Sequence, residues 1–233
     1  ARAAPPARPA AATPAPVSSP LDELDFGDPV MARSIRAAKR VAARALPILL
    51  VGETGTGKEL FARALHAAGE RASAPFVAVS CGELSEELLQ GALARAKGGT
   101  LFLDDVGELP VTLQARLLHV LEHREAAASG ERRADDVRLI AASAASLEPR
   151  IRRKEFREDL FYRLQGLALT LPRLCERADK RALIRHVFAQ EAADTPSVSL
   201  SESLGEALCV QRWPGNLRQL RNALRAMIAL RSS

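Results

Sequence analysis

The chain has 233 residues, enough for one α/β core and a small second domain. Hydrophobic residues make up 47% of it but aromatic residues only 4%, so Ala, Leu and Val must fill the core. The formal charge of +5, carried mainly by arginine, permits contact with nucleic acid without indicating it. The sequence predicts neither a membrane span nor a signal peptide, and Cys81, Cys175 and Cys209 have the spacing of neither a metal site nor a disulfide framework. We therefore expect a cytoplasmic protein with reduced thiols.

The first 20 residues consist almost entirely of Ala, Pro, Arg and Ser, a composition that cannot bury a core. Because prolines favour an extended, solvated chain, residues 1–20 are predicted to form a disordered linker. The folded core is expected to span residues 21–171. It opens with a predicted helix at 34–45, where basic and apolar residues alternate at helical spacing.

Beyond Pro47, short apolar runs alternate with helical patterns. Strands are predicted at 48–51, 76–80, 100–104, 137–142 and 167–171. Helices are predicted at 58–68, 85–96, 112–124 and 147–154. This alternation predicts an α/β fold with a mostly parallel sheet and with ligands at the carboxyl ends of the strands.

The strands stop after Pro172, and residues 172–233 are predicted to form a small helical unit. Its helices are expected at 179–192, 201–210 and 216–230.

A glycine-rich segment follows the first predicted strand and reads Gly52-Glu53-Thr54-Gly55-Thr56-Gly57-Lys58-Glu59. Its glycines let backbone N–H groups approach phosphate oxygens closely, and the next helix points its positive end the same way. Lys58 adds a positive charge for the β- and γ-phosphates. In the general phosphate-loop motif a Ser or Thr follows the Lys and binds Mg²⁺ through its hydroxyl, but here Glu59 stands in that place. We predict a nucleotide-phosphate site at residues 52–59.

Two adjacent carboxylates, Asp104 and Asp105, lie at the end of the strand predicted at 100–104. In phosphate-loop NTPases an Asp at this strand end holds Mg²⁺, directly or through water, and an acidic neighbour can polarise the attacking water. The two motifs together predict ATP and Mg²⁺ as ligands, with Asp104 on the metal and Asp105 beside the water.

With these motifs in place, the chain resembles the AAA+ ATPase domain of bacterial sigma-54-dependent transcription activators, and its opening looks closest to regulators of the acetoin-catabolism type. The strings that carry the resemblance begin at Gly52, Gly98, Phe156 and Trp213, and they read GETGTGKEL, GGTLFLD, FREDLFYRL and WPGNLR. Glu59 is itself usual in this family. The resemblance implies a P-loop AAA+ core at 21–171 and a helical lid at 172–233.

The resemblance also implies roles for three arginines. Arg157 and Arg163 match the arginine fingers that reach into the nucleotide of the next subunit, and Arg218 matches the lid arginine that senses the γ-phosphate. A guanidinium supplied by a neighbouring subunit neutralises charge on the transferred phosphate, so the resemblance implies a nucleotide-dependent ring oligomer.

The family's loop that engages sigma-54, which carries the motif Gly-Ala-Phe-Thr-Gly-Ala, has no counterpart here. Residues 90–97 run straight into Gly98, with neither the motif nor room for a protruding loop. RNA polymerase and a sigma factor are the partners that the resemblance implies, but we expect no productive engagement of sigma-54. Contact with DNA is expected only through a domain that this sequence does not contain.

Three further positions depart from the family on the side that activates water. Asp105 replaces a Glu and is shorter by one methylene, which withdraws the carboxylate from the water by about a bond length. Ser80 and Ala144 stand where the family has Asn. The departures predict that ATP is bound while its hydrolysis is impaired.

The main hypothesis is therefore an ATP-binding regulatory domain that does not remodel sigma-54. The alternative is an active ATPase that activates sigma-54 RNA polymerase, and a P-loop kinase for a small acceptor is a minor alternative.

Overall fold

The structure is a computed structural model that describes residues 19–44, 46–127, 136–195 and 198–231. The linker predicted at 1–20 lies outside these described residues except for its last two positions. No helix within the described residues is long and apolar enough to cross a membrane.

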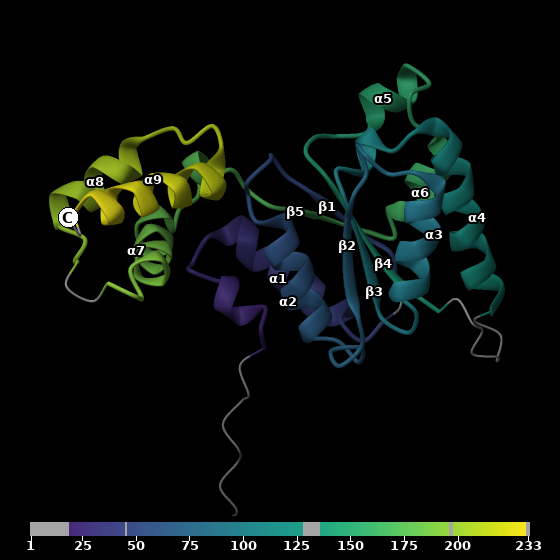
Figure 1. The fold of residues 1–233 in the computed structure, drawn as a ribbon, viewed down its shortest axis with the longest axis horizontal. Coiled ribbons are helices and arrows are strands. Elements are labelled where there is room, and N and C mark those ends of the chain that lie inside the picture. The colour runs from purple at the N-terminus through teal and green to yellow at the C-terminus, as the bar shows by residue number, and fades with distance from the viewer. Residues whose placement is uncertain (1–18, 45, 128–135, 196–197, 232–233) are drawn as a thin grey trace, which may run out of the picture.

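A five-stranded parallel sheet forms the centre of the larger part of the molecule, with strand order β2-β3-β4-β1-β5 (Figure 1). The strands are β1 (Ile48–Val51), β2 (Phe76–Ser80), β3 (Thr100–Asp104), β4 (Arg138–Ser143) and β5 (Leu167–Thr170). All five predicted strands are present, and their ends differ from the prediction by at most one residue. Because the order places β1 between β4 and β5, the residues that follow β1 emerge at the middle of one sheet edge.

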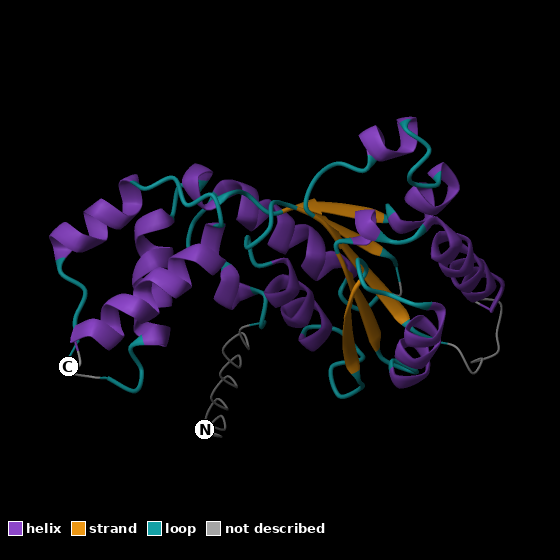
Figure 2. Ribbon diagram, turned by 45° about the horizontal axis from the view of Figure 1, so that its top comes forward, coloured by secondary structure: helices purple, strands orange, loops and turns teal. Residues whose placement is uncertain are grey.

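Helices cover both faces of the sheet (Figure 2). One face packs against α1 (Pro29–Val41) and α2 (Lys58–Ala67) through a core that includes Ile48, Leu50 and Phe102. The other face packs against α3 (Glu86–Arg95), α4 (Val111–Ala127), α5 (Glu148–Arg152) and α6 (Glu158–Leu164). Leu49 and Leu103 point to that second face, as expected where side chains alternate along a strand. Because the side chains on both faces of the sheet are buried, the strands appear in the sequence as continuous apolar runs.

Two helices of this part differ from the prediction. Helix α1 begins at Pro29 instead of residue 34, because the Asp28 side chain accepts hydrogen bonds from the N–H groups of Val30 and Met31 and Pro29 takes the first helical position. Helix α6 was not predicted as a helix. It has only seven residues, too few for a helical period to stand out, and it is held by burial of Leu160 and Leu164.

Three helices beyond β5 form a separate small core, and we call them the lid: α7 (Lys180–Glu191), α8 (Glu202–Val210) and α9 (Asn216–Arg231). Trp213 is buried in this core, and its indole N–H donates to the carbonyl of Leu208 at 2.7 Å. The lid lies beside the sheet on the side of α1 and α2 (Figure 1). Its position brings the start of α9 to the loop after β1.

Candidate functional site

The phosphate-loop residues lie at the carboxyl end of β1, where two neighbouring strands fix the start of the loop. The N–H of Gly52 donates to the carbonyl of Ser143 at the end of β4, at 3.1 Å, and the N–H of Leu171 donates to Val51 at 2.8 Å. The loop therefore departs from a rigid part of the sheet. The sequence predicted this position correctly, because a strand, a glycine-rich turn and a helix follow one another without interruption.

Two glycines have backbone conformations that other residues rarely adopt. Gly55 has φ +82°, and a Cβ there would lie 2.3 Å from the carbonyl oxygen of Gly215 in the lid. Gly57 has φ +96° and is the residue before α2, so it offers no side chain to cap that helix. The N–H groups of the first turn of α2 are thus left for an anion.

The Lys58 side chain is buried, and its ammonium donates to the carbonyls of Gly52 and Glu53, at 2.8 and 3.2 Å. Burial lowers its pKa, and the nearby carboxylates of Asp105 and Asp104 act in the opposite direction. The chain thus holds a desolvated cation within the loop, where its attraction to a phosphate is screened less than at the surface.

The other side chains of the loop have separate tasks. The hydroxyl of Thr56 donates to the carbonyl of Glu53 at 2.8 Å and closes the loop on itself, while Thr54 is exposed. Glu59 is also exposed and pairs with Arg63 at 2.7 Å, one helical turn further on. Its carboxylate also lies close enough to Asp104 for its charge to raise the pKa of Asp104.

Asp104 and Asp105 lie side by side at the end of β3, near Lys58. Burial raises the pKa of Asp104, and the charge of Asp105 raises it further, whereas Lys58 lowers it. Asp105 has φ +50°, a left-handed conformation that Asp tolerates, and its Oδ1 is buried without a hydrogen-bond partner among the described residues. Two adjacent carboxylates, one of which has an oxygen without a hydrogen-bond partner in the described part of the chain, form a site that favours a cation.

The chemistry of this pair suits a divalent cation such as Mg²⁺. Among the described residues no group of three or more His, Cys, Asp or Glu side chains could hold a metal. Mg²⁺ needs no such cage, because it is usually bound by one or two carboxylates together with phosphate oxygens and water. Asp104 and Asp105 beside a phosphate loop match that arrangement.

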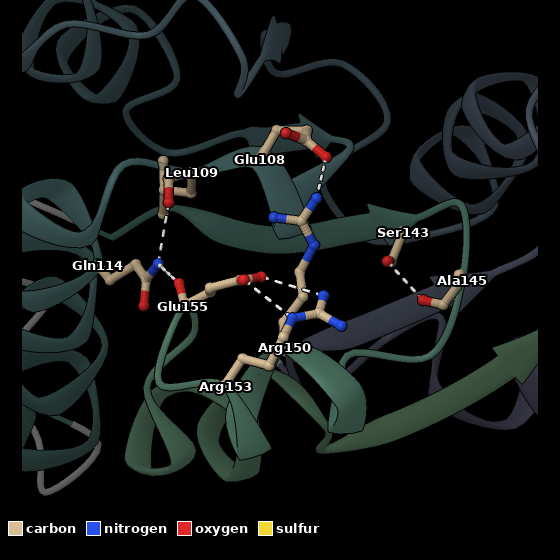
Figure 3. Close-up of polar contacts among 8 residues, drawn as sticks. All are labelled: Glu108, Leu109, Gln114, Ser143, Ala145, Arg150, Arg153 and Glu155. Atoms are coloured by element: carbon tan, nitrogen blue, oxygen red, sulfur yellow. Dashed lines mark hydrogen bonds and ion pairs between the residues drawn. The ribbon is translucent and has the colours of Figure 1, made fainter.

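Ser80 and Ala144, at the positions expected to assist the attacking water, lie at the same sheet edge but present few hydrogen-bonding groups to it. Ser80 is the last residue of β2 and pairs with Asp104 of β3 in the sheet register. Ser80 is exposed. Ala144 follows β4 and has only a methyl group. The neighbouring hydroxyl of Ser143 is already engaged, because it donates to the carbonyl of Ala145 at 2.6 Å (Figure 3).

The lid closes on the phosphate loop through the start of α9. The N–H of Leu217 donates to the carbonyl of Gly55 at 2.9 Å. Asn216 is buried, and its side-chain amide donates to the carboxylate of Glu53 at 3.2 Å and to the carbonyl of Thr54 at 3.1 Å. Arg218 is exposed two residues further along, and its charge lowers the pKa of Lys58. Arg218 thus lies near the phosphate loop.

The other two predicted arginines lie on a different part of the surface. Arg157 precedes α6, is exposed, and pairs with Asp159 at 2.6 Å. Arg163 is half-buried in the last turn of α6. The charged groups that act on Lys58 are Asp105, Asp104 and Arg218, and neither of these arginines is among them. A role at a nucleotide would therefore require the site of another subunit.

Three residues near these segments escaped the sequence reasoning. Asn216 was read only as the start of a helix, and Arg173, which pairs with Glu53 at 3.4 Å, was not singled out. Gln114 on α4 is fully buried and binds backbone atoms of distant segments. Their partners are mostly backbone groups or residues far along the chain, so no local pattern marked them.

Comparison with known proteins gives two family matches. A model of the family described as the sigma-54 interaction domain matches residues 25–94 and 89–170, and the AAA+ ATPase lid domain matches residues 176–233. Together these two matches cover the core and the lid.

Curated relatives are similar to this chain over most of its length. It is 39% identical to the transcriptional regulatory protein GlrR of Escherichia coli over 88% of the chain and 52% of the relative. It is 40% identical to the acetoin catabolism regulatory protein of Cupriavidus necator, over 88% of the chain and 34% of the relative. The chain therefore spans about half the length of GlrR and about a third of the acetoin regulator.

Solved structures share the fold. NtrX from Brucella abortus, solved in complex with ATP, superposes with a TM-score of 0.77 at 34% identity, covering 88% of this chain and 50% of NtrX. The RuvB branch migration motor of Thermotoga maritima superposes with a TM-score of 0.65 over 93% of this chain and 67% of RuvB. At 17% identity, RuvB bears on the fold alone.

Proposed function

We propose that this chain, which belongs to the sigma-54 interaction domain family, is the nucleotide-binding domain of a bacterial transcriptional regulator that binds ATP and Mg²⁺ but hydrolyses ATP slowly and does not remodel sigma-54. The phosphates would lie against residues 52–59 and Mg²⁺ beside Asp104. The core at 21–171 and the lid at 172–233 are the two parts between which the nucleotide would be enclosed.

Nucleotide binding is supported by the site and by a relative. The buried ammonium of Lys58, the uncapped first turn of α2 and the carboxylate of Asp104 meet at one sheet edge. NtrX, which has the same fold at 34% identity, was solved in complex with ATP. Bound Mg²⁺ would supply positive charge to the phosphate oxygens, and Asp104 would hold and orient it.

Slow hydrolysis is supported by the groups that face the attacking water. Asp105 has the shorter acidic side chain, Ala144 has no hydrogen-bonding group, and Ser143 is engaged by Ala145. Losing a single well-placed hydrogen-bonding group can slow an enzyme by about a hundredfold or more. Arg157 and Arg163, which would serve a neighbouring subunit, are present. ATP binding and assembly of subunits would therefore be retained while activation of the attacking water is weak.

The observation that carries the proposal is the direct connection between α3 and β3. Helix α3 runs without a break from Glu86 to Arg95, and β3 begins at Thr100. Between them the N–H of Gly98 donates to the carbonyl of Asp136 and the N–H of Gly99 to the carbonyl of Ala96, both at 2.8 Å. These hydrogen bonds hold the connection against the rest of the fold. The family model matches in two segments, 25–94 and 89–170.

A capture experiment tests the proposal. The chain is bound to a transition-state analogue of ATP hydrolysis with Mg²⁺ and mixed with sigma-54, with GlrR treated identically as the positive control. We expect capture by GlrR and none by this chain. Stable nucleotide-dependent capture by this chain would contradict the proposal.

Assembly and wider partners belong to the same proposal. Arg157 and Arg163 lie away from the chain's own phosphate loop, which suits a nucleotide-dependent ring in which each subunit serves the next. Contact with DNA would come from a domain outside this sequence, and a regulator that acts on transcription would work in the cytoplasm. Two alternatives use the same phosphate loop. An active sigma-54 activator would hydrolyse ATP rapidly, and a kinase would transfer the phosphate to a small acceptor molecule.

A further inference from the structure

We propose that Gln114 is a positioning residue that ties the turn after Asp104 and Asp105 to the backbone of Arg157. Through this link, the nucleotide state of one subunit would set the position of the arginine that it offers to the next. The inference rests on the proposed function, because it takes Arg157 to act on a neighbouring nucleotide.

The amide of Gln114 binds three backbone groups from two segments, and Figure 3 shows the bonds to Leu109 and Glu155. Its Nε2 donates to the carbonyl of Leu109 at 2.9 Å and to that of Glu155 at 3.0 Å. Its Oε1 accepts from the N–H of Arg157 at 2.8 Å. Three of the four hydrogen bonds open to a Gln side chain are therefore made in a site from which solvent is excluded.

The pairing with Glu155 and Arg157 fixes the bend that leads into α6. Glu155 and Phe156 form this bend and Arg157 has extended dihedrals, and the Gln114 amide binds the carbonyl of Glu155 and the N–H of Arg157 on either side of Phe156. Phe156 between them is buried. The backbone of Arg157 is thus held while its guanidinium stays at the surface, paired with Asp159 at 2.6 Å.

The other end of the link lies one short turn from the acidic pair. Asp105 precedes the turn Val106–Glu108, and Leu109 follows it. Glu108 forms an ion pair with Arg150 on α5 (Figure 3), so the turn contacts the segment leading to Arg157 a second time. A cation that draws Asp104 and Asp105 together would move this turn, and the buried, close-packed Gln114 amide would transmit the movement.

Hydrogen exchange on the unaltered chain tests the link without a mutation. At a protein concentration below that of assembly, ATP with Mg²⁺ should raise protection at residues 52–58, 104–109 and 153–160 together. Protection that rises only in the first two segments would overturn the inference.

Gln114→Met keeps the length of the side chain and removes its hydrogen bonds, and Gln90→Met on the exposed face of α3 is the matched control. We expect Gln114→Met to bind ATP within about threefold of the parent, since it contacts no phosphate-loop residue. The protein concentration needed for assembly with the transition-state analogue should rise about tenfold, a typical coupling between sites. Adding Gln114→Met to Arg157→Ala should cause no further loss, because both act through one arginine.

Mixing subunits separates positioning from general damage. At an ATP concentration too low to load them, Lys58→Ala subunits hold no nucleotide but offer an intact Arg157. Mixed with Gln114→Met subunits, they should form pairs at a protein concentration where neither variant assembles alone. A mixture that stays unassembled would overturn the inference, and so would Gln114→Met assembling like Gln90→Met. If the unaltered chain itself fails to assemble with nucleotide, the proposed function is wrong and the inference is overturned with it.

Discussion

The side-chain amide of Asn216 in the lid donates to the carboxylate of Glu53 in the phosphate loop, 3.2 Å away, across 163 residues of sequence. The same side chain accepts from the N–H of Leu174 at 2.8 Å, at the entry to the lid. Asn216 therefore joins the loop, the lid and the connection between them. The lid is held against the phosphate loop by these polar contacts.

Replacing Asn216 should loosen this junction. Asn216→Ala leaves the buried N–H of Leu174 without its partner, which should lower the free energy of unfolding by about 1–3 kcal/mol. ATP affinity should fall as well. Chemical denaturation and calorimetry measure the two effects, with Asn222→Ala, exposed on the same helix, as the control. Equal behaviour of the two variants would contradict the structural role of Asn216.

Lys58 should be indispensable for binding. Lys58→Ala removes the ammonium that would meet the β- and γ-phosphates, and charge-assisted hydrogen bonds contribute about 1.5–3 kcal/mol each. We expect ATP affinity to fall roughly tenfold to a hundredfold or more in calorimetry, while Lys97→Ala, exposed before β3, has no effect. Equal affinities of parent and Lys58→Ala would exclude a nucleotide at this loop.

The raised pKa of Asp104 predicts a gain in stability when its charge is removed. Burial and Asp105 favour the protonated form of Asp104 in the folded chain, so its ionised form costs free energy at every pH above the raised pKa. Asp104→Asn should therefore raise the melting temperature at neutral pH, by roughly 2–4 °C per kcal/mol of repulsion relieved.

This gain should vanish as the pH falls through the raised pKa of Asp104, because the parent then becomes protonated too. Melting curves across that range, with the exposed Asp194→Asn as the control, follow the effect. Addition of Mg²⁺ and ATP should reverse the order of stability, since only the parent gains from the metal. A lower melting temperature for Asp104→Asn without ligand would contradict this account of the acidic pair.

The sequence predicted the parts of the molecule that obey local rules. The strand leading to Gly52 and the strand ending at Asp104 were found from apolar runs bounded by polar residues. The start of α1 was missed because the capping by Asp28 and Pro29 precedes the basic pattern that was read as the helix. The link through Gln114 was invisible, because two of its three partners are backbone atoms about 40 residues away and a helix surface with one Gln looks ordinary.

This domain is proposed to bind ATP and Mg²⁺ while hydrolysing ATP slowly. Steady-state ATP turnover at saturating ATP and Mg²⁺ tests this most directly, beside a sigma-54 activator that has the Gly-Ala-Phe-Thr-Gly-Ala loop and Glu at the position of Asp105. We expect turnover at least about a hundredfold below that of the activator at equal subunit concentration, since Asp105 is short and Ala144 has no hydrogen-bonding group, with partial recovery in Asp105→Glu. Turnover comparable to that of the activator, and abolished by Lys58→Ala, would contradict slow hydrolysis.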